Sequence, residues 1–87
     1  MAETFRKTWR GEVVSSNGFS VRLSGKNALT YKDGYGELRV FTEPMSGSRT
    51  IEVFSDGIPE SPERSRLQVM DNIARALRHA GWVSIPA

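Results

Sequence analysis

The stretch PESPERSRLQVMDNIARALRHAG, residues 59–81, decides the fold of this 87-residue chain. Before it, short runs of alternating apolar and polar residues are separated by glycine-containing turns. Within it, apolar residues recur every three or four positions. This change from a period of two to a period of 3.6 predicts a sheet followed by one amphipathic helix.

We expect the helix to cover residues 62–80, with Ser61 as its N-cap, Pro62 in the first helical position and Gly81 just beyond its C-terminal end. Its apolar stripe spans about half the circumference, which is typical of a helix that lies on a sheet. Arg66 falls within this apolar arc, and nothing in the sequence assigns it a role. The stripe consists of Leu67, Met70, Ile73, Ala74 and Leu77, widened by Val69, Ala76 and Ala80.

Five strands are predicted, at residues 9–15, 19–23, 28–32, 37–43 and 49–55. The Asn17-Gly18 pair is typical of a hairpin in which both turn residues take positive φ. Because the turns are short, the strands should form an antiparallel meander. Residues 82–85 fit either a short edge strand or the packing of Trp82 under the helix end. The expected fold is therefore α+β: a single domain of residues 1–87, with about five strands and one C-terminal helix on one face.

Composition narrows the function classes. The chain has no cysteine, so it has no disulfide and no thiolate metal site, which suits a reducing cytoplasm. The first ten residues lack the apolar core of a signal peptide, and no apolar run is long enough to cross a membrane. The formal net charge of +2 is mild, whereas dedicated nucleic-acid binders usually carry a denser basic stripe.

No catalytic, metal or cofactor motif is present. The one histidine, His79, falls near the helix C-terminus, where the helix dipole explains a basic residue. The segment Gly34-Tyr35-Gly36 joins two predicted strands and lacks the Lys-Ser/Thr of a phosphate loop. We therefore expect a protein that is not an enzyme and that uses no cofactor and no metal.

One helix is about 10 Å wide and five strands span about 24 Å, so one sheet face should stay open. On that outer face the pattern places Arg39, Phe41 and Glu43, with Glu52 and Phe54 on the next strand. A solvated face supported by an Arg39–Glu52 cross-strand pair is one interpretation. A partner-binding face with aromatic anchors in a charged rim is the other.

Several segments together resemble the immunity protein 74 family of bacterial polymorphic toxin systems. They are Trp9-Arg-Gly-Glu-Val13, Asn17-Gly18, Tyr31-Lys-Asp-Gly34, Leu38 to Glu43, Ile51 to Phe54, and the helix Arg66 to Leu77 followed by Gly81. The likeness runs from about Trp9 to Ile85. Membership would imply a non-enzymatic protein that binds and silences a toxin made by the same cell, and it would carry over no specific binding residues.

A second hypothesis is a small nucleic-acid-binding domain. It would use Arg6, Lys7, Trp9 and Arg10 together with the helix arginines, because single-strand binders interleave aromatic and basic groups. The mild net charge makes nucleic acid the weaker partner hypothesis. Terminal strands would leave an exposed edge, which permits a homodimer by strand addition. No membrane partner is expected.

Overall fold

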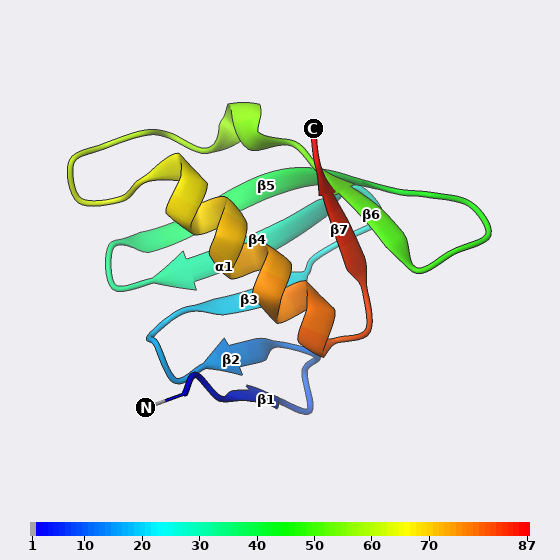
Figure 1. The fold of residues 1–87 in the computed structure, drawn as a ribbon, viewed down its shortest axis with the longest axis horizontal. Helices are drawn as coiled ribbons and strands as arrows, with labels where there is room; N and C mark the ends of the chain where they lie inside the picture. Colours follow the sequence, from blue (N-terminus) through cyan, green and yellow to red (C-terminus); the bar gives the residue numbers. More distant parts are fainter. Residues whose placement is uncertain (1) are drawn as a thin grey trace.

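A computed structural model describes residues 2–87 and shows an α+β fold, as the sequence predicts. One sheet curls into a half-barrel, and one C-terminal helix crosses its concave face (Figure 1). Among residues 2–87, neither helical segment combines the length and the apolar character that a bilayer-spanning helix needs. The elements in chain order are β1 (Phe5–Lys7), β2 (Val13–Ser15), β3 (Ser20–Leu23), β4 (Ala28–Asp33), β5 (Gly36–Pro44), β6 (Thr50–Val53), the short 3₁₀ helix η1 (Ser55–Gly57), α1 (Arg66–His79) and β7 (Val83–Pro86).

The sheet has seven strands, so the expectation of about five was wrong. The strands lie in sequence order, and every neighbouring pair is antiparallel except β6 and β7. That last pair is parallel, because α1 lies between the two strands in the chain and supplies the long crossover that a parallel pair requires.

The predicted first strand, residues 9–15, is in fact a turn followed by a strand. The backbone N–H of Gly11 donates to the Thr8 carbonyl at 3.0 Å, and the Thr8 N–H donates to the Glu12 carbonyl at 2.8 Å. With Gly11 at φ 81°, this is a three-residue hairpin loop that ends in a left-handed residue. The loop folds β1 back onto β2, which adds a strand at the N-terminal edge.

The Asn17-Gly18 hairpin is present, with a different turn from the one expected. Only Gly18 has positive φ, at 92°. The Gly18 N–H donates to the Ser15 carbonyl, and the Ser15 N–H donates to the Phe19 carbonyl. The β2–β3 loop therefore repeats the three-residue geometry of the β1–β2 loop.

The helix begins at Arg66 rather than at Pro62. Ser65, with extended φ and ψ, is the N-cap, and its hydroxyl accepts a hydrogen bond from the Gln68 N–H. Ser61 instead closes a separate turn with Arg64, because each backbone N–H donates to the other's carbonyl. The predicted end is confirmed: the helix stops at His79, and Gly81 follows with φ 92°.

The helix is also rotated relative to the predicted apolar stripe. Its buried residues are Val69, Asn72, Ile73, Ala76 and Leu77. Leu67, predicted to face the sheet, is 82% exposed. Asn72 takes a core position because its side-chain amide donates to the hydroxyl of the fully buried Tyr31 at 3.0 Å. A buried phenol hydroxyl needs a hydrogen-bond partner, so a polar residue replaces an apolar one at this position.

Arg66 is held by the loop before the helix. Its guanidinium Nε donates to the Ile58 carbonyl at 2.7 Å, while its backbone N–H donates to the Glu60 carboxylate. Ile58 is fully buried, so the contact ties the helix start to a loop residue that is anchored in the core. This assigns a structural role to a residue for which the sequence offered none.

Candidate partner-binding face

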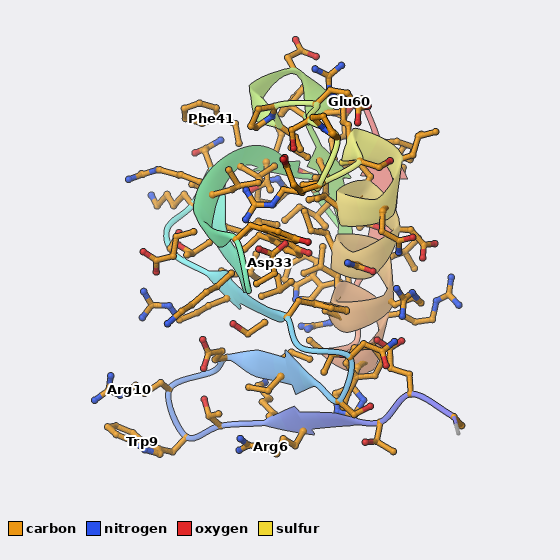
Figure 2. The ribbon with its side chains drawn as sticks, turned by 90° about the vertical axis from the view of Figure 1, so that its left-hand side faces the viewer. Arg6, Trp9, Arg10, Asp33, Phe41 and Glu60 are labelled. Carbon is orange, nitrogen blue, oxygen red and sulfur yellow. The ribbon has the colours of Figure 1, made fainter. Side chains whose placement is uncertain are left out.

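The outer, convex face of the sheet brings together four of the five predicted site residues. Glu43 on β5 pairs directly with Glu52 on β6. Two residues along each strand, the Phe54 N–H donates to the Phe41 carbonyl at 2.9 Å, so these two residues also lie opposite each other. Phe41 is 58% exposed and points away from α1 (Figure 2). Two cross-strand pairs, one aromatic and one acidic, are therefore adjacent.

Arg39 lies at the margin of this group. It faces the same way as Phe41, because the two are separated by one residue of β5, but its register partner is Thr30 on β4. The predicted Arg39–Glu52 cross-strand pair is wrong, because Glu52 lies opposite Glu43. The strand register separates the two charges that sequence alternation alone had placed together.

Three further residues extend the face and were missed as site residues. Val83 and Ile85 on β7 lie opposite Thr50 and Glu52 and are exposed, as is Met45 just beyond β5. For Val83 and Ile85 the sequence signal was the alternation of residues 82–85, which indicated an edge strand but not the neighbour it pairs with. We call the set of seven the acidic–apolar face: Phe41, Glu43, Met45, Glu52, Phe54, Val83 and Ile85.

The acidic pair in this face has no compensating cation. Within residues 2–87 every ion pair uses Arg64 or Arg75, which bond Asp33, Glu3 and Asp71. Like charges directly opposite on neighbouring strands are destabilising, by roughly 0.2–1 kcal/mol. The isolated protein thus keeps a repulsive pair of carboxylates among the apolar side chains of this face.

A Glu52→Gln substitution should therefore stabilise the protein. We expect the free energy of unfolding to rise by about 0.2–1 kcal/mol, because the repulsion with Glu43 disappears while the side chain keeps its size. Urea denaturation at pH 7 measures this change. Glu37→Gln is the matched control, since Glu37 lies opposite Lys32 on the same outer face and should lose an attraction. A lower stability for Glu52→Gln would contradict the repulsion.

A polar cavity of about 230 Å³ lies between the N-terminal end of α1 and the two hairpin turns at residues 16–19 and 34–35. Its polar groups bind one another. Burial raises the pKa of Tyr31, although the hydrogen bond with Asn72 opposes this, so the phenol stays protonated. Burial would also raise the pKa of Asp33, but the hydrogen bonds from Arg64 and from the Tyr35 N–H outweigh this effect and hold the pKa below its usual range. These contacts join the β4–β5 turn to the segment before α1.

The side chains that could ligate a metal are dispersed within residues 2–87. His79 stacks on Phe5 with ring centroids 5.5 Å apart, and no three His, Cys, Asp or Glu side chains of that part lie together as a metal site would need. The helix arginines of the nucleic-acid hypothesis are largely engaged: Arg64 pairs with Asp33, and Arg75 with Glu3 and Asp71. The N-terminal residues of that hypothesis are divided, with Arg6 on the outer face and Lys7 beside a different cavity.

Comparison of the chain with protein-family models, curated proteins and solved structures gave no match.

Proposed function

We propose that this chain is a non-enzymatic immunity protein that binds and neutralises a bacterial toxin domain in the cytoplasm through the acidic–apolar face. The observation that carries the proposal is the uncompensated Glu43–Glu52 pair set among exposed apolar side chains. The resemblance to the immunity protein 74 family supports it independently.

The composition of the face favours a protein partner with basic groups. Aromatic side chains near the centre of an interface often carry much of the binding energy, and Phe41 and Phe54 are placed for that role. A carboxylate that leaves water on binding must be paired, so arginine or lysine of the partner would have to meet Glu43 and Glu52. A standard interface takes about 800 Å² from each partner, and the described chain exposes 5643 Å².

The proposal is tested by alanine substitution of Phe41 and Phe54, with the product of the neighbouring reading frame as the candidate toxin. We expect each single substitution to weaken binding at least tenfold, about 1.4 kcal/mol, because each removes an aromatic anchor. Co-expression rescue and calorimetric titration measure protection and affinity. Leu67→Ala is the matched control, since it truncates an exposed apolar residue on the opposite side of the molecule.

Full protection and unchanged affinity in a folded Phe41→Ala/Phe54→Ala variant would contradict the proposed face. A second measurement separates binding from folding: Glu52→Gln should raise the free energy of unfolding and at the same time lower the affinity for the toxin. A residue that only supports the fold would move both quantities in the same direction.

A further inference from the structure

A second cavity, of about 220 Å³, lies between the β1–β2 turn and the C-terminal end of α1. Its floor is apolar and comes from the sheet and the helix. Its remaining wall comes from three segments that are far apart in sequence: the β1–β2 hairpin, the start of β6 and the residues after α1. The lining is Lys7, Arg10, Gly11, Val13, Val21, Leu23, Arg49, Leu77, Ala80 and Trp82.

The charged groups that line this cavity are all cations. Lys7, Arg10 and Arg49 contribute to its wall, and no aspartate or glutamate does. None of the three has a carboxylate within ion-pair distance in residues 2–87. Arg49 is held in place, because its guanidinium donates to the carbonyls of Gly81 and Ala80 at 2.9 and 3.1 Å. The site therefore has fixed positive charge beside an apolar floor.

Trp82 lines this cavity, whereas Trp9 lies outside it, on the neighbouring β1–β2 turn and on the side away from α1 (Figure 2). The Arg49 guanidinium lies 4.6 Å from the ring centre of Trp82, and that of Arg10 lies 4.9 Å from the ring centre of Trp9. Trp9 is 89% exposed and projects from the β1–β2 turn (Figure 2). The Thr8 hydroxyl accepts from the Glu12 N–H in that turn, which adds to the two backbone bonds that close it. The hairpin thus holds a large aromatic face in solvent.

We propose that this cavity is a binding site for single-stranded nucleic acid. One base would enter the cavity against Trp82, a neighbouring base would stack on Trp9, and the phosphates between them would meet Lys7, Arg10 and Arg49. Aromatic platforms beside cations are the arrangement by which proteins bind unpaired strands. A base within a duplex could not enter, because its edges and faces are already occupied.

The chain's modest net charge does not argue against this site, because many of the acidic residues lie in one segment away from the cavity. Between Glu43 and Glu63 the sequence carries five acidic residues and one basic residue, Arg49. Half of the ten acidic residues therefore lie near β6 and the loop before α1. Glu12 and Glu37 line a separate cavity with Arg10, but no carboxylate lines the site itself. A ligand with a planar apolar body and an anionic group fits such a site better than an acidic peptide, whose carboxylates offer no face to stack.

Intrinsic fluorescence reports directly on the site, since Trp9 and Trp82 are the only tryptophans. We expect a ten-nucleotide oligothymidylate to quench this fluorescence saturably at micromolar protein and about 50 mM salt. Three phosphate contacts predict that log K falls against log salt with a slope of about −2, at roughly −0.7 per contact. Absence of quenching under these conditions would overturn the proposal.

Charge-neutralising variants locate the binding. In Lys7→Gln/Arg10→Gln the affinity should fall at least tenfold and the salt slope should shrink to about −0.7, since one cation remains. Lys32→Gln/Arg39→Gln removes the same charge from the outer face and should leave affinity within twofold. Equal losses in the two variants would overturn the site, as would quenching by phosphatidylglycerol vesicles without quenching by the oligonucleotide.

Two checks complete the test. Thermal unfolding shows that each variant is folded, and Trp9→Ala, which leaves the floor intact, should weaken binding about tenfold. The proposed toxin-binding face shares no residue with this cavity. Failure of either proposal therefore leaves the other standing.

Discussion

Replacing Ile73 with alanine should lower the free energy of unfolding by about 2–5 kcal/mol, the largest stability loss we expect from any single substitution in the helix. Ile73 has no exposed surface and lies in the middle of α1, among the core residues of the concave face. Truncation removes buried methyl groups and leaves a space that the surrounding strands cannot close. Because a domain of this size is stabilised by only about 5–15 kcal/mol, the variant should melt well below the wild-type protein.

Leu67→Ala on the same helix is the matched control for this prediction. Its side chain is mostly exposed, so we expect a change within about 0.5 kcal/mol. Urea denaturation of the two variants measures the difference. Comparable losses at both positions would mean that the helix packs on the stripe predicted from sequence rather than on the face centred on Ile73.

The rotation of α1 shows that local sequence periodicity predicts a helix but not which of its faces is buried. Periodicity correctly identified a helix ending before Gly81, because both signals are local. It could not identify Asn72 as a buried residue, since the reason is the hydroxyl of Tyr31, 41 positions earlier in the chain. Once Asn72 occupies the core, Leu67 must turn toward solvent.

The strands show the same limit: local alternation predicts the side to which a residue points but not its cross-strand neighbour. Alternation assigned residues to the two faces of the sheet correctly at Phe41 and Phe54, because side-chain direction follows from the period of two. Alternation could not predict which residues lie opposite each other on neighbouring strands. It therefore paired Arg39 with Glu52, whereas in the structure Glu43 lies opposite Glu52. It also read the Trp9–Gly11 turn as a strand, because a three-residue loop interrupts the pattern too briefly to be seen.

The aromatic and acidic residues of the candidate face were thus predictable, but its boundary was not. Val83 and Ile85 reach it only because β7 joins β6 in parallel after the helix. The basic cavity was less predictable still. Lys7 and Arg49 are 42 positions apart, and they meet because seven strands curl around one helix.

Asp33→Asn should lower the free energy of unfolding by about 1–3 kcal/mol at pH 7, through the loss of a charged partner for Arg64. The Arg64 Nε donates to the Asp33 carboxylate at 3.2 Å, and both side chains are largely buried. Asparagine keeps one oxygen for the Tyr35 N–H, so the turn itself should persist. In this variant the Arg64 guanidinium would keep only the Gly36 carbonyl as a partner on β5.

The pH dependence distinguishes this ion pair from simple packing. Although burial alone would raise the pKa of Asp33, the hydrogen bonds from Arg64 and Tyr35 bring it below its usual range in the folded state. The unfolded chain therefore binds the proton first as the pH falls, and the stabilisation is complete above the unfolded pKa and disappears as the pH falls through the folded one. Urea denaturation from about pH 6 to about pH 2 should show the wild-type and Asp33→Asn curves converging in acid. Asp56→Asn is the control, since it removes a carboxylate at an exposed position that makes no ion pair within residues 2–87. A constant gap between wild type and Asp33→Asn would assign the loss to packing, and the Arg64 pair would then contribute nothing.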